Sequence, residues 1–377
     1  MDFELDQVQR TFQSRFRDVV DDHIVGENGD WDDGNFPEDV YQVLVDIGML
    51  GLHLPEELDG QAVDPLTAGI AYEELGRGDV GLATLVLSEN IATKILGEYG
   101  DEHHRDVAAE VARGEAKIAF GLTEPDHGSD ASDIETTARR ADDEWVFSGE
   151  KTAITVATLA DYCLLFARLD DESEIGAFLL PTDQPGVEVQ PYAGMGCEVS
   201  GWGQLYLDDA RAPAGARVGE QSGFKMAMET FDKSRAWIGL YSLGAAQQTL
   251  DETEQYLTER EAFGKPLAGF EGPQFQVAEL QTKVDSARLK AYETLWRATE
   301  GKPHTKDAAM VKWYAPDVAV ETIHECLVLH GHYGYAEDFG IEQRLRDTIG
   351  LQIGDGTPQV QKLVIARETF GREYLPY

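Results

Sequence analysis

The sequence predicts a multidomain α+β protein with an N-terminal α-helical domain, a middle β-barrel or β-sandwich domain and a C-terminal four-helix bundle. Three observations carry this prediction. The chain has 377 residues, which is more than one ordinary domain contains, and 42% of them are hydrophobic, which is enough for sizeable cores. The spacing of apolar residues is helical at both ends of the chain and strand-like between them. We expect domains at 1–116, 117–218 and 219–377.

The N-terminal domain has helical periodicity. Val8, Phe12 and Phe16 recur at four-residue steps, which places them on one face of a helix. Pro37 marks the start of a second helix, because proline fits the first helical turn without losing a hydrogen bond. Further helices are expected at 66–75 and 82–99, with a break at 76–81 (GRGDVG).

The pattern changes near Lys117. Short β-branched or aromatic segments, bounded by Gly, Pro and Asp, predict strands at 144–149, 162–168, 175–181 and 203–208. Helical spacing returns near Phe224 and continues to the end of the chain. Long amphipathic segments with short connections are typical of a helical bundle, and here they lie at 237–262, 274–298, 308–329 and 359–372.

The charge of the chain excludes two classes of partner. The formal net charge is −39, from 70 acidic against 31 basic residues. Nucleic acid and anionic membranes would be repelled, so we expect neither as a partner. The acidic residues are spread over every segment, as on the surface of a halophilic protein, where molar salt screens their repulsion. We therefore expect a halophilic protein that loosens in low salt.

Other sequence features point to the cytoplasm. The acidic start at 1–6 (MDFELD) lacks the basic and apolar regions of a signal peptide, and no apolar run reaches about 18 residues. The 3 cysteines are widely spaced and predict reduced thiols. No metal site is expected, because the C-terminal histidines have no suitably spaced Cys or carboxylate partners; these are His324, His330 and His332.

The most distinctive stretch lies at 120–130 (FGLTEPDHGSD). Pro125 removes a backbone donor and Gly128 permits a positive φ, so the segment turns sharply. Its N–H groups and hydroxyls suit a ligand rich in acceptors, such as a flavin ring edge or a pyrophosphate. An ordinary Asx or ST turn between two strands explains the same residues. A Rossmann site or P-loop is not expected, because no strand–Gly-x-Gly-x-x-Gly–helix unit is present.

Several stretches, in the same order along the chain, resemble the acyl-CoA dehydrogenase family. They are 122–130 (LTEPDHGSD), 149–155 (GEKTAIT), 231–235 (FDKSR), 260–264 (REAFG), 330–335 (HGHYGY) and 354–359 (GDGTPQ). The resemblance covers nearly the whole chain. It implies an FAD-dependent enzyme on a non-Rossmann site, an acyl-CoA substrate, an electron-transferring flavoprotein as acceptor, and a homodimer or homotetramer.

The implied reaction is α,β-dehydrogenation of an acyl-CoA thioester. A carboxylate removes the α proton while a hydride leaves Cβ for flavin N5. The resemblance assigns the base to Asp355, where the family keeps a Glu, whereas the family's alternative base position is Ser234 here. The pair Gly354 and Asp355 also occurs in relatives that resemble cyclohexane- and cyclohexene-carboxyl-CoA dehydrogenases. Because both residues are small, we expect a roomier pocket and an alicyclic or α-branched acyl group.

The resemblance assigns further residues by position. Cofactor binding falls to Phe120, Leu122, Thr123, Ser129, Ile154, Thr155, Arg260, Phe263, Thr357 and Gln359; substrate binding falls to Ser129, Asp232, Arg235 and Gly356. Within these sets, Thr155 lies near flavin N5, and Arg260 and Phe263 reach the FAD of a neighbouring subunit. Ala153 stands where the family usually has a Trp against the ring. Asp232 and Arg235 alternatively form an ordinary helical ion pair on a solvated face.

Other functions remain open at this point. An acyl-CoA oxidase or a nitroalkane-oxidase-like flavoenzyme would use the same fold, and rapid reoxidation by O₂ would distinguish it. A non-catalytic scaffold that binds flavin or acyl-CoA is the alternative from another class. The presence of Asp355 argues against the scaffold, because loss of the base would be its signature.

Overall fold

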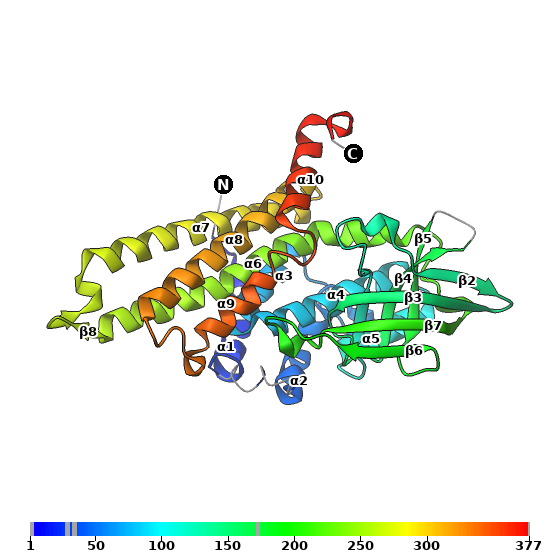
Figure 1. The fold of residues 1–377 in the computed structure, drawn as a ribbon, viewed down its shortest axis with the longest axis horizontal. Helices are drawn as coiled ribbons and strands as arrows, with labels where there is room; N and C mark the ends of the chain where they lie inside the picture. Colours follow the sequence, from blue (N-terminus) through cyan, green and yellow to red (C-terminus); the bar gives the residue numbers. More distant parts are fainter. Residues whose placement is uncertain (1–3, 27–30, 32–35, 171–173, 376–377) are drawn as a thin grey trace. The chain divides into compact units, whose positions relative to one another are not determined.

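The computed structural model describes residues 4–26, 31, 36–170 and 174–375, and it confirms the predicted order of helices, a β domain and helices (Figure 1). Residues 1–3 of the acidic start lie outside the described residues. The chain forms two compact units. The helical unit draws on Met1–Asn35, Asp64–Ala83 and Asp232–Tyr377, and the sheet unit on Phe36–Val63 and Thr84–Phe231. The domain boundaries expected after 116 and 218 stay a prediction.

Within the described residues, the sheet unit contains a seven-stranded mixed sheet in the order β1-β4-β2-β3-β7-β6, and β5 also pairs with β4. The strands are β1 (Ile118–Gly121), β2 (Thr137–Ala141), β3 (Glu144–Ile154), β4 (Tyr162–Leu169), β5 (Ile175–Pro181), β6 (Val187–Pro191) and β7 (Gly203–Pro213). β4 occupies the centre because its apolar run is almost continuously buried.

The connection between β1 and β2 follows from how both strands pair with β4. β1 lies parallel to residues 162–165 of β4, and β2 lies parallel to residues 168–169. β5 covers the opposite edge of β4 over residues 162–168, so β1 and β2 share one edge. The intervening segment, 122–136, therefore leaves the sheet at a gap in this edge. It contains the motif that the sequence singles out.

Helices of the sheet unit include α2 (Glu38–Asp46), α5 (Glu102–Ala112) and most of α4 (Val80–Tyr99). Asp101 begins α5 with a capping box, in which its side chain and that of His104 accept each other's backbone N–H groups. α4 is long and apolar enough to cross a membrane, but 78% of its most apolar window is buried inside the structure. This burial is typical of a core helix.

The helical unit contains long helices and a small hairpin. Its elements are α1 (Gln7–His23), α3 (Pro65–Gly78), α6 (Gly223–Glu259, whose first turns belong to the sheet unit), β8 (Glu261–Ala262), β9 (Lys265–Pro266), α7 (Glu271–Thr299), α8 (Thr305–His330), α9 (Ile341–Gly350) and α10 (Pro358–Phe370). Asp64 caps α3 by accepting from the N–H groups of Leu66 and Thr67, and Pro65 fills the first helical position.

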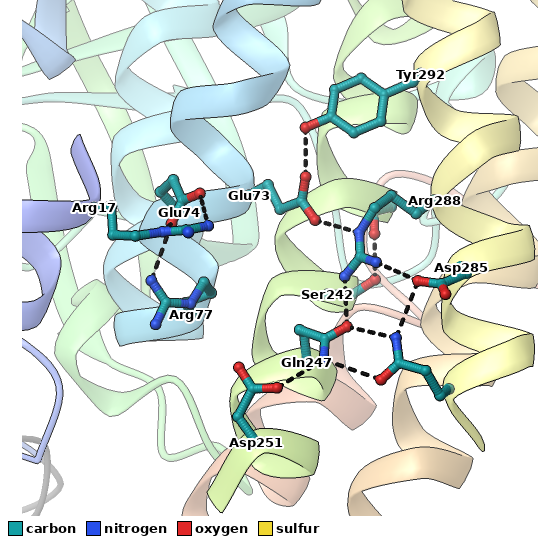
Figure 2. A network of polar contacts seen from close by, with 12 residues as sticks. Arg17, Glu73, Glu74, Arg77, Ser242, Gln247, Asp251, Asp285, Arg288 and Tyr292 are labelled. Carbon is teal, nitrogen blue, oxygen red and sulfur yellow. Dashed lines mark hydrogen bonds and ion pairs between the residues drawn. The ribbon is translucent and has the colours of Figure 1, made fainter. Parts of the chain in front are cut away.

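Ion pairs at partly buried positions join the helices of this unit (Figure 2). Glu73 of α3 accepts a hydrogen bond from the Arg288 guanidinium of α7 at 2.6 Å, and Arg288 also donates to Gln247 of α6 at 2.9 Å. The neighbouring Glu74 accepts from Arg17 of α1 at 2.7 Å. Two consecutive carboxylates of α3 thus connect this helix to α7 and α1, each through a cationic partner, and Arg288 extends the network to α6.

The structure corrects several element boundaries. Only Asp79 separates α3 from α4, so the predicted break at 76–81 is too wide. The helix predicted to reach Ala262 ends at Glu259, because residues 261–266 form a hairpin whose turn residues, Phe263 and Gly264, have φ of 53° and 82°. The sequence patterns did not resolve β2 and β6, which are short. They also missed α9, although Ile341, Leu345 and Ile349 recur there at four-residue steps.

Candidate active site

The loop after β1 carries the first group of predicted cofactor residues. The Thr152 N–H of β3 donates to the Thr123 carbonyl at 3.0 Å, so the loop lies against the strand that the resemblance also assigns to flavin. The hydroxyls of Thr123, Ser129 and Thr155 have no hydrogen-bond partner among the residues that the structure describes. Thr123 and Thr155 are half-buried and Ser129 is exposed. These hydroxyls are available to a ligand.

A buried ion pair fixes this loop. The Lys151 ammonium of β3 is fully buried and donates to Glu124 at 2.7 Å and to the Leu122 carbonyl at 3.0 Å. Glu124 also accepts from the backbone N–H groups of Glu135 (2.6 Å) and Thr136 (2.9 Å). A single carboxylate therefore joins the start of the loop, its end and β3.

The pKa values of Lys151 and Glu124 reflect both burial and the charge of the partner. Burial lowers the pKa of Lys151 to about 8, although the neighbouring Glu124 acts to raise it. For Glu124, burial acts to raise the pKa, but the Lys151 charge and the hydrogen bonds bring it below its ordinary value. Each group stays charged near neutral pH because the other is present.

The next predicted residues lie at and just after a register shift in β3. The pairing of β3 with β7 shifts register between Lys151 and Ile154, and Ala153 there has a φ of 53°. Bulges of this kind redirect side chains locally. Ala153 is exposed, whereas Ile154 is buried at 2% exposure. The position at which the resemblance expects a Trp is thus an exposed Ala on a distorted strand.

Two other predicted cofactor residues face the interior. The Phe120 ring lies 4.8 Å from Phe166 and 5.6 Å from Phe231, centroid to centroid, and Leu122 is buried. Their side chains pack the base of the loop. A contact of these residues with a cofactor would therefore involve their backbone or one edge of the ring, whereas the hydroxyls are directly available.

In the helical unit, Asp355 lies in the loop between α9 and α10. It is half-buried, and its backbone adopts the left-handed region with a φ of 52°. The Ser234 hydroxyl of α6 donates to its carboxylate at 3.2 Å. Burial raises the pKa of Asp355, while the positive charges of Lys312 and Arg235 and the Ser234 hydrogen bond act to lower it. A carboxylate with a raised pKa is suited to accept a proton.

Asp232 and Arg235 form the predicted ion pair, at 3.1 Å. Asp232 also accepts from the Thr305 hydroxyl at 2.6 Å. Arg235 is only 7% exposed, and its Nε has no partner among the described residues. A solvated helical pair does not match this burial. The pair borders Asp355, whose charge acts on Arg235.

The remaining predicted residues lie on surfaces of the helical unit. Phe263 is 97% exposed at the turn of the β8–β9 hairpin, and Arg260, just before the hairpin, is also exposed. Thr357 caps α10, where its side chain accepts from the Val360 N–H, and Gln359 is exposed in the first turn of that helix. Gly356, at φ 101°, follows Asp355 in the same loop.

Sequence reasoning missed the residues that hold these segments in place. They are Glu124 and Lys151 in the sheet unit, and Lys312, Gln361 and the hydrogen-bonding role of Ser234 in the helical unit. One signal was available for Lys312, because it falls on the apolar face of a helix between Ala308, Val311 and Ala315. A lysine at such a position needs a buried partner.

The donor set fits the FAD that the resemblance implies. Among the residues that the structure describes, three hydroxyls lack a protein partner, and Gly128 has open space where a side chain would stand, so a bulky acceptor-rich group can approach the loop. Thr123, Thr155 and Ser129 would hold the flavin and its phosphates. Across the described residues, no group of three or more His, Cys, Asp or Glu side chains is placed to hold a metal ion.

Comparisons with known proteins agree with the resemblance. Three family profiles match in order: the acyl-CoA dehydrogenase N-terminal domain at 6–115, the middle domain at 119–210 and the C-terminal domain at 221–370. The probable acyl-CoA dehydrogenase YngJ of Bacillus subtilis is 33% identical, over 98% of this chain and 99% of its own length. The caffeyl-CoA reductase–Etf complex subunit CarC of Acetobacterium woodii is 33% identical, over 88% and 90%.

A solved structure shows the same architecture with the cofactor. The glutaryl-CoA dehydrogenase of Mycobacterium smegmatis in complex with FADH2 superposes with a TM-score of 0.93, at 27% identity, over 98% of this chain and 96% of that one. The chain therefore belongs to the acyl-CoA dehydrogenase family and is an FAD-dependent oxidoreductase that dehydrogenates acyl-CoA thioesters.

Proposed function

We propose that Asp355 is the base that removes the α proton of the acyl-CoA, and that the acyl group is alicyclic or α-branched. The observation that carries the first part is the setting of Asp355: a half-buried carboxylate with a raised pKa, held by Ser234 beside two cationic side chains. FAD, when bound, accepts the hydride from Cβ.

The base needs to be ionised before the reaction and to accept a proton during it. Burial makes the ionised form of Asp355 more basic, and the Ser234 hydroxyl keeps one carboxylate oxygen oriented. The proton from the substrate Cα passes to the carboxylate, which becomes a neutral carboxylic acid that burial favours. The electron pair of the broken Cα–H bond then forms the Cα=Cβ double bond as the hydride leaves Cβ.

The resemblance assigns four residues to substrate binding. We propose that Asp232 and Arg235 lie beside the pantetheine chain, with Gly356 and Ser129 as further contacts. The buried Arg235 has a donor, Nε, that the described residues leave without a partner. In the cofactor site, we propose hydroxyl contacts from Thr123, Ser129 and Thr155, and adenine-side contacts from Thr357 and Gln359.

The acyl group is inferred from the size of two side chains. Asp355 is one methylene shorter than Glu, and Gly354, which is exposed, has no side chain at all. These two small residues leave room for a ring or a branch at Cα. Straight-chain esters of four to eight carbons should therefore reduce the flavin more slowly than cyclohexanecarboxyl-CoA. Much faster turnover of the straight chains would contradict this proposal.

We further propose an electron-transferring flavoprotein as acceptor and a homo-oligomer as the working form. CarC, at 33% identity, is named as a subunit of a complex with Etf. The exposed Phe263 and Arg260 suit a contact with the FAD of a second subunit. Slow flavin reoxidation by O₂ and fast reoxidation by an added Etf support the acceptor, and sedimentation in high salt gives the number of subunits. We also propose that the protein is cytoplasmic, because its 3 cysteines are few and widely spaced, and halophilic, because its net charge is −39.

The direct test of the base is Asp355→Asn. The variant should bind FAD and the CoA ester but lose flavin bleaching by about 100- to 10,000-fold, which is the usual contribution of a positioned general base. Anaerobic titration followed near 450 nm measures both binding and bleaching. Bleaching at the wild-type rate would remove Asp355 from this role.

A further inference from the structure

Lys312 closes the loop that carries the proposed base. Its side chain is fully buried on α8, and its ammonium donates to the Leu351 carbonyl at 2.7 Å and to the Gly356 carbonyl at 3.4 Å. These two carbonyls lie on either side of Asp355 in the sequence. One ammonium therefore ties the beginning of the loop to its end.

A neutral side chain holds the same loop from α10. The Gln361 side-chain amide, which is also buried, donates to the carbonyls of Asp355 (3.1 Å) and Gly356 (3.2 Å). Asp355 has a φ of 52°, which costs free energy for a residue with a side chain. The surrounding hydrogen bonds keep the backbone in this conformation. Lys312 and Gln361 share the task, but only Lys312 brings a charge.

The charges that face this loop are few. Lys312 faces Asp355, Arg235 of α6 and Asp317 of its own helix, and Arg367 of α10 acts on Arg235. Burial lowers the pKa of Lys312 to about 8, although Asp355 and Asp317 act to raise it. Within the described residues Lys312 makes no ion-pair contact, so its charge is compensated by carbonyl dipoles and by Asp355 at longer range.

We infer that Lys312 is a positioning residue for α-proton abstraction: it fixes the loop that presents Asp355, and its positive charge favours the ionised form of that carboxylate. This inference rests on the proposed role of Asp355. Lys312 would act on the base in two ways. The hydrogen bonds to Leu351 and Gly356 fix the conformation of the loop, while the positive charge determines the pH above which Asp355 is ionised.

The test compares Lys312→Met with Gln361→Met. Both substitutions remove a buried clamp of the same loop, but only the first removes a charge. The readout is the pH dependence of anaerobic flavin bleaching in the holoenzyme with cyclohexanecarboxyl-CoA. In Lys312→Met the acidic limb of the pH–rate profile, where the rate rises as the base ionises, should move to higher pH by about one unit. The reason is that an opposite charge near a carboxylate lowers the pKa of that carboxylate by roughly this amount or more. In Gln361→Met the plateau rate should fall with the limb unmoved.

The outcomes decide between the two effects. Lys312→Arg, which retains the charge, should return the limb to its wild-type pH. An unmoved limb in Lys312→Met overturns the inference, as does an equal shift in Gln361→Met. If Lys312→Met does not yield folded holoenzyme, Lys312→Gln serves the same comparison. Asp355→Asn keeps the two proposals apart: bleaching by that variant refutes the base itself, whereas its loss with an unmoved limb in Lys312→Met refutes only the role of Lys312.

Discussion

Among the described residues, each of the two units buries one lysine completely, and the two units compensate its charge in different ways. Lys151 in the sheet unit contacts the Glu124 carboxylate at 2.7 Å, whereas Lys312 in the helical unit donates to backbone carbonyls and has only longer-range charges around it. Burial lowers the pKa of both lysines to about 8. Similar pKa values thus arise beside an ion pair in one unit and beside the carbonyl groups of a loop in the other.

The difference indicates two purposes for a buried ammonium. Lys151 and Glu124 depend on each other, so the removal of either leaves an uncompensated charge inside the sheet unit. Lys312 leaves only carbonyl groups behind when it is removed, but it takes away a charge that acts on Asp355. We expect changes at Lys151 to appear mainly in stability and cofactor binding, and changes at Lys312 mainly in the pH dependence of the reaction.

The largest effect is expected for Lys151→Met. Glu124 would remain buried without its cation, which costs about 3–5 kcal/mol, and the loop that carries Thr123 would lose its anchor. The unfolding free energy should fall by that amount, and FAD affinity should fall more than tenfold, as followed by flavin fluorescence. Lys117→Met is the matched control, because Lys117 is also a mostly buried lysine of this unit, paired with Glu38 at 3.3 Å. Wild-type FAD affinity in Lys151→Met would show that the pair does not serve the cofactor site.

Glu124→Gln should cost less, about 2–3 kcal/mol. The amide oxygen still accepts from the backbone N–H groups of Glu135 and Thr136, and Lys151 can lose its proton once the negative charge is gone. Denaturant unfolding of this variant and of Lys151→Met gives the order of the two effects. A larger loss of unfolding free energy in Glu124→Gln than in Lys151→Met would show that the unpaired carboxylate is not the main cost.

Lys312→Met should destabilise the protein by about 1–2 kcal/mol, which is the scale of lost hydrogen bonds to neutral groups. FAD affinity should stay within about threefold of wild type, a difference of less than 1 kcal/mol. The same unfolding and fluorescence titrations on Lys151→Met should show larger losses of both stability and FAD affinity. A loss of FAD binding in both variants would mean that the two lysines serve one purpose.

The smallest effect concerns pH. A lysine with a folded pKa of about 8, below its unfolded value of about 10.4, binds fewer protons in the folded state, so its contribution to stability rises with pH. Between about pH 7 and 9 each buried lysine should add about 1 kcal/mol. The wild-type rise over this range should therefore shrink in each Lys→Met variant. The same rise in wild type and variant would indicate an ordinary pKa for that lysine.

Much of the architecture could be predicted from the sequence. The change of apolar spacing near Lys117 and its return near Phe224 gave the order of helices, strands and helices, because each period reflects which face is buried. Several short elements were missed. β2 and α9 depend on neighbours that are distant in the sequence, and the β8–β9 hairpin depends on two residues with positive φ.

The candidate site was predictable only in part. The hydroxyls of the loop and Asp355 were predicted from the resemblance to the family. The partners that hold them were not, because Lys151 and Glu124 are separated by 27 positions and Ser234 and Asp355 by 121. No local sequence pattern predicts pairs of residues that lie so far apart in the chain. A lysine within an apolar stretch, as at Lys312, is the exception that a sequence can show.

The central claim, that Asp355 removes the α proton, can be measured apart from hydride transfer. We would incubate wild type and Asp355→Asn in D₂O with 3,3-dimethylbutyryl-CoA, which has α hydrogens but no β hydrogen, and follow α-deuterium incorporation by mass spectrometry. Perturbation of the flavin spectrum would establish that both proteins bind the ester. We expect exchange by the wild type and its loss in Asp355→Asn. Exchange at the wild-type rate by the variant would contradict it.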